Sequence, residues 1–362
     1  MNDALRRVTP VVRLAPAKLN LTLAVLGRRA DGFHALHSVM APLDLADRLA
    51  LGPAFGPADR LHVVGPGGAP PPDLGPPDDN LVLRARRVAR RAVREAGDDR
   101  PLPALAVRLE KRIPAAAGLG GGSSDAVAAL DGALEAWGVE EVLGPPARAA
   151  AAAALGSDCP FFLAGGWALA EGRGERVKPL PEPRGAAPGV VLVTPAIAVP
   201  TPAVFARYAA GVRAPGGAAL ASSGHLAGEL QAGLATARLL DRAGIMAAAN
   251  DLIPATADLV PSLAAFRRAL ARLLGRPVGQ SGSGPTLWAL APSPAEAREL
   301  AAAVLAALAE GSLVAPGDRE PFVGAAALAG DRAAGSPSAA APASSRPTGD
   351  APPDDGPLAV SS

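Results

Sequence analysis

The 362-residue sequence has few cysteines and histidines and almost no net charge, and each shortage excludes a kind of protein or site. Its single cysteine, Cys159, excludes a disulfide scaffold and a cysteine-based zinc site. Four histidines without an HxxxH pair argue against a histidine-rich metal site. The formal net charge of +1 lacks the positive excess of proteins that bind nucleic acid without sequence specificity, so we expect no nucleic-acid partner.

The sequence also lacks a recognisable membrane span or leader. The mean hydropathy of +0.22 comes largely from alanine. The longest uncharged apolar stretch, residues 185–206, contains four prolines, which a lipid-exposed helix does not tolerate. Residues 1–7 carry two arginines with no apolar segment behind them, unlike a signal peptide. We therefore expect a cytoplasmic protein with no membrane partner.

Lysine is rare as well, because arginine supplies almost all the basic residues. Only Lys18, Lys111 and Lys178 are present. Arginine cannot replace lysine where a compact ammonium group is needed. The three lysines are therefore enriched in functional candidates.

Composition divides the chain into two domains and a tail. The proline-rich segment 179–188 suggests a boundary, which we place between an N-terminal domain of residues 1–182 and a C-terminal domain of residues 183–328. Residues 329–362 consist mostly of Ala, Ser, Pro and Gly and have no aromatic residue, which is typical of a disordered tail.

The apolar spacing predicts strands and helices in both halves. Alternation predicts a strand over residues 18–25, with one apolar and one partly polar face, and another over 105–109. Helical spacing predicts a helix begun by Ser123 or Ser124, and others over residues 146–155, 263–273 and 294–308, the last behind a capping box at 293–296. This mixture predicts an α+β fold.

The glycine-rich segment, residues 113–125 (IPAAAGLGGGSSD), lies between a predicted strand and a predicted helix. Glycines let backbone N–H groups approach an anion closely, and a helix N-terminus supplies further donors. No lysine follows as in a Walker A loop, the Rossmann spacing is absent, and no HRD or DFG motif occurs. The segment therefore predicts a phosphate site of another kind, although a plain glycine turn is the alternative.

Two further motifs accompany it: APAKLNL at residues 15–21, and QSGSGPT at 280–286, which contains the serine turn, residues 281–286. Together the three resemble the signature motifs of the GHMP kinases, the superfamily of galactokinase, homoserine kinase, mevalonate kinase and phosphomevalonate kinase. The resemblance runs over roughly residues 10–325. It implies a two-domain α+β architecture with the active site in the cleft between the domains.

Within the superfamily, segments 16–36 and 156–175 resemble the branch whose acceptor is a methylerythritol that carries cytidine diphosphate. The resemblance implies an ATP- and Mg²⁺-dependent kinase that phosphorylates the acceptor 2-hydroxyl in the non-mevalonate route to isoprenoid precursors. Its partners would be ATP and this small-molecule substrate, and the protein would be a monomer or a homodimer. The metal ligands stay unassigned.

The resemblance also implies residue roles, with Lys18 activating the acceptor and Asp158 taking its proton. Residues implied to bind ATP are Asn80, Pro114, Ala115, Ala116, Ala117, Gly118, Leu119, Gly120, Gly121, Gly122, Ser123 and Ser124. Residues implied to bind the acceptor are Asn20, Phe33, His34, Thr201, Phe205, Ser281, Gly282 and Ser283, with Phe33 and Phe205 on either side of the cytosine ring and His34 at its edge.

Plainer interpretations stand beside these roles. Lys18 could be an exposed strand lysine, Asp158 a turn residue, Asn80 a helix N-cap and Cys159 a small buried apolar residue. Two other functions also stay open: another GHMP kinase, of homoserine or mevalonate type, and a catalytically silent regulator of the same family. The aromatic set argues against the first, and the presence of both Lys18 and Asp158 against the second.

Overall fold

A long strand organises the first half of the chain in the computed structural model, which describes residues 8–71, 74, 79–211 and 217–330. Strand β3 spans 20 residues and pairs with β1, β2, β5 and β6 of a seven-stranded sheet. Every pair of neighbouring strands in this sheet is antiparallel except β4 with β5, which is parallel. The strands are β1 (Val11–Asn20), β2 (Ala24–Arg28), β3 (His34–Pro53), β4 (Arg60–Val64), β5 (Leu105–Glu110), β6 (Ala168–Gly172) and β7 (Arg176–Pro179).

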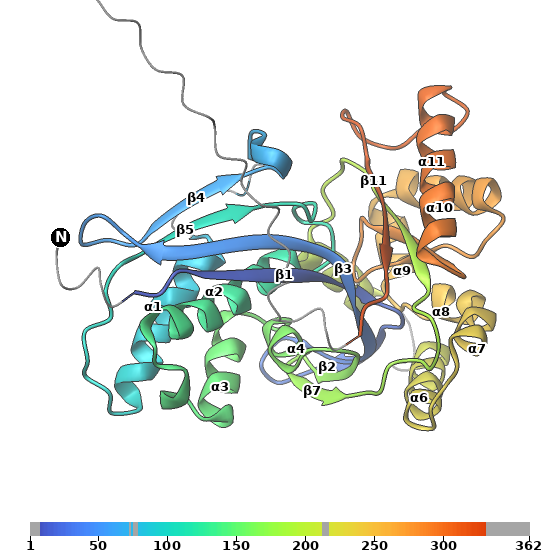
Figure 1. Cartoon of the computed structure of the whole chain (residues 1–362). Coiled ribbons are helices and arrows are strands. Elements are labelled where there is room, and N and C mark those ends of the chain that lie inside the picture. Colours follow the sequence, from blue (N-terminus) through green and yellow to red (C-terminus); the bar gives the residue numbers. More distant parts are fainter. Residues whose placement is uncertain (1–7, 72–73, 75–78, 212–216, 331–362) are drawn as a thin grey trace, which may run out of the picture.

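Helices cover one face of this sheet (Figure 1). They are α1 (Leu81–Glu95), α2 (Gly121–Trp137), α3 (Pro145–Leu155) and α4 (Cys159–Ala164). Their buried side chains, such as Leu130 and Leu134 of α2, form one core with Leu49 and Leu109 of the sheet. The predicted strand at 105–109 and the predicted helix at 146–155, which is rich in alanine, are confirmed, and the helix ends before Gly156.

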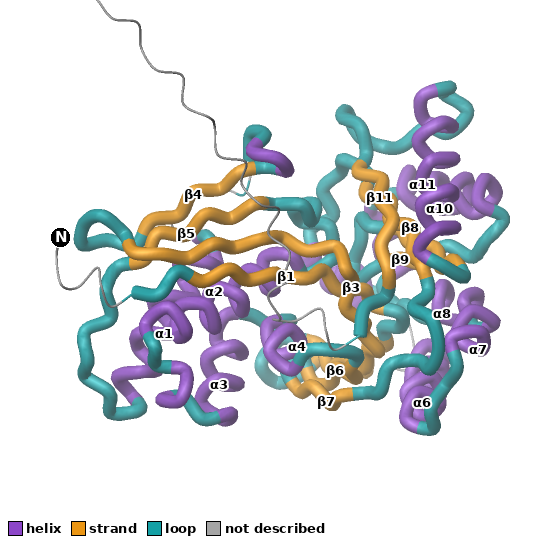
Figure 2. Tube along the Cα trace, in the orientation of Figure 1, coloured by secondary structure: helices purple, strands orange, loops and turns teal. Residues whose placement is uncertain are grey.

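The second half is built on a smaller antiparallel sheet surrounded by helices (Figure 2). Its strands are β8 (Gly189–Thr194), β9 (Gly279–Gln280), β10 (Leu287–Ala291) and β11 (Phe322–Ala327), in the order β11-β8-β10-β9. Its helices are α5 (Thr201–Ala210), α6 (Ala218–Gln231), α7 (Thr236–Asp241), α8 (Ala243–Ala248), α9 (Ile253–Leu259), α10 (Pro261–Leu274) and α11 (Pro294–Ala309). Ser293 caps α11 as predicted, since its hydroxyl accepts from the Glu296 N–H. The α+β expectation is confirmed.

The two halves share a core and backbone hydrogen bonds. Leu19 and Leu43 pack in one cluster with Trp288 and Leu290 of the second sheet. The Ala329 N–H donates to the Pro42 carbonyl of β3, at the end of the described chain. Residues 180–188 connect β7 to β8, and the domain boundary near them stays a prediction. Residues 331–362, most of the expected tail, lie outside the described residues.

Three local predictions were wrong. The strand expected over 18–25 breaks after Asn20, because Leu23 leaves the sheet to exchange backbone hydrogen bonds with Ala249 and Asp251 of the second half. Its partly polar face, with Lys18, Asn20 and Thr22, is buried. Helical spacing also predicts Leu273 on the apolar face of α10 that contains Leu270. Instead Leu273 is exposed and Leu274 is buried, because the buried side of the helix passes from Leu270 to the residue four positions later.

The third wrong prediction concerns the start of α2. Ser123 and Ser124 lie inside the helix, which begins at Gly121 after an N-cap at Gly120. Gly120 has a φ of 71°, a left-handed conformation that favours glycine. The Ser124 N–H donates to the Gly120 carbonyl, the first hydrogen bond of the helix.

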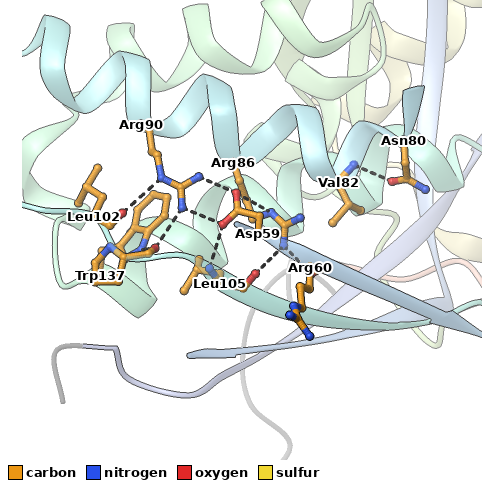
Figure 3. Close-up of polar contacts among 10 residues, drawn as sticks. Asp59, Arg60, Asn80, Val82, Arg86, Arg90, Leu102, Leu105 and Trp137 are labelled. Atoms are coloured by element: carbon orange, nitrogen blue, oxygen red, sulfur yellow. Dashed lines mark hydrogen bonds and ion pairs between the residues drawn. The ribbon is translucent and has the colours of Figure 1, made fainter. Parts of the chain in front are cut away.

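A buried arginine cluster fixes α1 to the edge of the sheet (Figure 3). Arg86 is fully buried, and burial lowers its pKa to about 10. Its Nε lies 3.6 Å from Asp59, and Arg90 donates to both oxygens of the same carboxylate at 2.6 and 2.8 Å. Although burial opposes it, these hydrogen bonds and charges hold the pKa of Asp59 below its ordinary value. One carboxylate therefore compensates two cations.

No helix among the described residues is long and apolar enough to cross a membrane.

Replacing Asp59 should destabilise the fold strongly. We expect Asp59→Ala to lower the free energy of unfolding by about 3–5 kcal/mol, because it leaves Arg86 buried without a counter-charge. Denaturant titration measures the change. Glu95→Ala is the matched control, since Glu95 pairs with Arg91 on the exposed side of α1 and should contribute less than about 1 kcal/mol. Equal, small losses in both variants would contradict the role assigned to Asp59.

Candidate active site

The three sequence motifs meet at the start of α2. The Lys18 N–H of β1 donates to the Leu119 carbonyl of the glycine-rich segment at 2.9 Å. The Ser281 hydroxyl of the serine turn donates to the Gly118 carbonyl at 2.9 Å and accepts from the Asn20 N–H at 3.4 Å. Segments more than 100 residues apart therefore form one backbone framework.

Close packing explains two of the glycines. A Cβ at Gly118 would lie 2.6 Å from the Ser281 carbonyl oxygen, and a Cβ at Gly120 would lie 2.8 Å from the Phe162 ring and 3.0 Å from Lys18 Cγ. Both glycines also have positive φ angles, 76° and 71°. Larger residues would therefore separate the glycine-rich segment from the serine turn or from Lys18.

The glycine-rich segment ends in a helix N-terminus that can receive an anion. Helix α2 is 17 residues long, and its first N–H groups, from Gly121 onward, have no acceptor in the preceding turn. Such donors and the positive end of the helix dipole favour a phosphate. The local geometry therefore fits the predicted phosphate site.

Lys18 and Asp158 form an ion pair beside this helix start. The Lys18 side chain is 5% exposed and the Asp158 side chain 36% exposed, and Lys18 Nζ lies 3.5 Å from Asp158 Oδ2. Nζ also donates to Asn20 Oδ1 at 2.6 Å, while Asn20 Nδ2 donates to the Ser38 hydroxyl at 2.8 Å. The ammonium group is thus held by the strand, whereas the carboxylate remains accessible.

A cavity of about 700 Å³ connects this pair to the aromatic residues. The His34 and Phe205 rings stack inside it, with centroids 5.1 Å apart and planes at 26°. Phe33 is 51% exposed, and the Arg173 guanidinium lies 5.3 Å from its ring centroid. Asp31, in the turn before Phe33, accepts from the Phe33 N–H. One end of the cavity is therefore ionic and the other aromatic.

The structure brings together most of the predicted acceptor residues. Those that line the cavity are Asn20, Phe33, His34, Thr201, Phe205, Gly282 and Ser283, and the Thr201 and Ser283 hydroxyls lie 2.8 Å apart. Ser281 does not line the cavity, but its hydroxyl hydrogen-bonds to Gly118, which does. Of the predicted nucleotide residues, Gly118 and Gly120 line the same cavity. Asn80 does not line it, and its side chain caps α1 by accepting from the Val82 N–H (Figure 3).

Sequence reasoning missed Arg173 and an ionic cluster behind the glycine-rich segment. Lys111 Nζ contacts both Asp47 and Asp125, with Asp125 Oδ2 at 2.7 Å, and lies 3.3 Å from where a Gly121 Cβ would be. Asp125 Oδ1 is buried without a hydrogen-bond partner, and burial raises the pKa of this carboxyl to about 7. The rarity of lysine was the one signal that pointed here.

Cys159, directly after Asp158, is fully buried. Burial raises the pKa of its thiol to about 11, which keeps it protonated at neutral pH. The interpretation of Cys159 as a small buried residue is confirmed.

Sequence comparison relates the chain to known kinases. The profile "GHMP kinases N terminal domain" matches residues 80–166, and "GHMP kinases C terminal" matches residues 231–310. The 4-diphosphocytidyl-2-C-methyl-D-erythritol kinase of Pelotomaculum thermopropionicum is 38% identical over 296 residues, which cover 81% of this chain and 93% of that protein. The protein of the same name from Xanthobacter autotrophicus is 44% identical over 299 residues, with coverage of 81% and 93%.

Structural comparison agrees. A crystal structure of 4-(cytidine 5'-diphospho)-2C-methyl-D-erythritol kinase has a TM-score of 0.59 and 34% identity, and the match covers 88% of this chain and 99% of that one. The L. major mevalonate kinase has a TM-score of 0.61 at 15% identity, covering 91% and 99%. This second likeness shows a common fold only.

The buried carboxyl of Asp125 gives a pH prediction. Because its pKa is raised from 3.8 to about 7, the folded state holds a proton that the unfolded state releases, so the free energy of unfolding falls as pH rises through that window. Asp125→Asn removes this contribution while Asp47 still pairs with Lys111. Denaturant titrations between about pH 5 and about pH 8 should therefore show a smaller fall in the variant.

The exposed Asp241→Asn is the control for that series. It should leave the pH dependence of unfolding as in the wild type. Identical slopes in the Asp125→Asn variant and the wild type would contradict the assignment.

Proposed function

Because the chain belongs to the 4-diphosphocytidyl-2-C-methyl-D-erythritol kinases of the GHMP kinase superfamily, we propose that it transfers the γ-phosphoryl group of ATP to the 2-hydroxyl of 4-diphosphocytidyl-2-C-methyl-D-erythritol. One observation carries the proposal beyond family membership. The same cavity has the Lys18–Asp158 pair at one end and the aromatic residues His34 and Phe205 at the other. This arrangement suits an acceptor with a reactive hydroxyl at one end and a base at the other.

The glycine-rich segment and the start of α2 would hold the ATP phosphates. Their backbone N–H groups supply fixed donors, and the packing against the serine turn keeps those donors in place. Phosphoryl transfer is catalysed mainly by positioning and by charge neutralisation, which a rigid loop of this kind provides.

Asp158 would act as the general base and Lys18 as the electrostatic stabiliser. The acceptor hydroxyl gives its proton to Asp158, its oxygen forms the new bond to the γ-phosphorus, and the bond to the β,γ-bridging oxygen breaks with its electrons leaving on ADP. Lys18, held by Asn20, lies where it can offset the negative charge that develops on the attacking and transferred oxygens.

The donor set fits a magnesium ion held mainly by ATP. Mg²⁺ at nucleotide sites keeps several waters and takes one or two protein oxygens besides the phosphates. The described residues hold no cluster of three His, Cys, Asp or Glu side chains. Ser123, in the first turn of α2, would offer its hydroxyl to such an ion. When bound, the ion would neutralise phosphate charge.

The aromatic end would recognise the cytosine. Phe33 and Phe205 offer ring faces, and His34 offers a polar edge in the same place. Stacking of a base on an aromatic side chain is worth about 1–3 kcal/mol. A small acceptor such as homoserine or mevalonate has no ring to occupy this end, which disfavours that alternative. A silent regulator would not require the Lys18–Asp158 pair.

An ADP-release assay tests the reaction. The protein is supplied with ATP, Mg²⁺ and 4-diphosphocytidyl-2-C-methyl-D-erythritol, with homoserine and mevalonate as parallel acceptors. We expect turnover with the cytidine compound alone. Turnover with homoserine or mevalonate would show that the protein is another kind of GHMP kinase. ATP binding without turnover would favour the silent regulator.

Asp158→Asn tests the base. It keeps the size of the side chain and removes its capacity to accept the proton, so we expect kcat to fall by roughly 10²–10⁴-fold while the KM for ATP changes little. The exposed Asp241→Asn is the control and should keep full activity. An unchanged kcat for Asp158→Asn would remove this residue from the mechanism.

Phe205→Leu tests base recognition. Leucine keeps the apolar packing but loses the stacking face, so the KM for the cytidine acceptor should rise by about 5- to 150-fold, whereas the KM for ATP stays the same. Phe55→Leu, at a side chain that is 80% exposed, should change neither. A parallel rise in the KM for ATP would contradict the assignment.

A further inference from the structure

A second cavity, of about 450 Å³, lies among α8, α9 and α10 and shares no lining residue with the active-site cavity. Its walls are mostly apolar. The residues that the three helices present to one another there are mostly alanines. Their side chains end at Cβ and do not fill the space between the helices. These small residues are Ala247, Ala248, Ala257, Ala264 and Ala271.

Two arginines give this apolar cavity a positive charge. Arg267 is half-buried and donates only to carbonyls, to Val278 at 2.6 Å and to Ala247 at 2.8 Å. Burial lowers its pKa, and no acidic group of the described chain opposes that shift. Arg268, also in the lining, is exposed, and neither arginine forms an ion pair among the described residues. A half-buried cation without a counter-ion favours an anionic ligand.

The floor of the cavity is connected to the active site. Thr256 donates to the Ser283 carbonyl at 3.1 Å, and Gln280 donates to the Gly282 carbonyl and to Thr256, both at 3.2 Å. Gly282 and Ser283 line the active-site cavity on their other side. The side chains of Thr256 and Gln280 therefore line the second cavity and also contact the serine turn.

We propose that this second cavity binds a small amphiphilic anion, a short aliphatic chain that ends in a carboxylate or a phosphate, and that its occupancy alters the serine turn. The head group would pair with Arg267 and Arg268, and the chain would fill the space among the alanines. A neutral chain of the same length would leave the guanidinium uncompensated and should bind more weakly. The binding claim does not depend on the proposed function.

Calorimetric titration of the full chain tests the binding. The probes are octanoate and octyl phosphate, with octanol as the neutral control of the same chain length. We expect saturable binding of at least one anion, at least about tenfold tighter than octanol, a ratio that corresponds to about 1.4 kcal/mol. The tighter anion identifies the head group. Octanol binding as tightly as both anions, or no binding of either anion, would overturn the proposal.

Cavity-filling variants locate the site. Ala264→Leu fills the cavity from α10, and Ala257→Leu fills it independently from α9. Ala265→Leu is the matched control, because Ala265 is exposed and lies outside the lining. Each filling variant that retains basal activity should weaken anion binding about tenfold or more, and Ala265→Leu should not. Unchanged affinity in both filling variants would place the ligand elsewhere.

Kinetics test the connection to the serine turn. With anion bound, the KM for the acceptor or kcat should change at least about twofold in the wild type and not in Ala264→Leu. Inhibition that is competitive with ATP and persists in Ala264→Leu would assign the anion to the nucleotide site and overturn the proposal. Because binding is measured without turnover, an inactive protein that binds the anions would count against the proposed function alone.

Discussion

The active site depends on one close approach, between the backbones of the glycine-rich segment and the serine turn. Gly118 lies against the Ser281 carbonyl with no room for a side chain. This approach fixes the loop that leads into α2, and the same loop holds β1 through the Lys18 N–H. The position of the lysine relative to the helix N-terminus therefore follows from a contact between the two halves of the chain.

Local sequence patterns predicted the features that local physics determines. The strand at 105–110, the alanine-rich helix ended by Gly156 and the Ser293 cap depend on alternation, propensity and capping within a few residues. The predicted start of α2 was wrong because serine and glycine are both acceptable N-caps. Packing of Gly120 against Phe162, 42 residues away, decides between them.

The motifs led to residues that line one cavity, but not to the contacts that support that cavity. Their resemblance to one superfamily identified the residues that line the cavity, such as Asn20 and Ser283. The contact of Asp47 with Lys111 could not be predicted, because the two residues are 64 positions apart and are brought together by the pairing of β3 with β5. The break after Asn20 was missed for the same reason, since its partners lie near residue 250. The spacing of residue types along the chain does not indicate which distant residues will pair.

The return of the chain to β3 near its described end has a consequence for synthesis on the ribosome. Pro42 receives its hydrogen bond from Ala329, and Ala117 receives one from Thr286. The N-terminal half thus emerges long before the residues that hydrogen-bond to β3 and to the glycine-rich segment. Until then the apolar surface around Leu19 and Leu43 has no cover from the second half, and exposed apolar surface of this kind promotes aggregation.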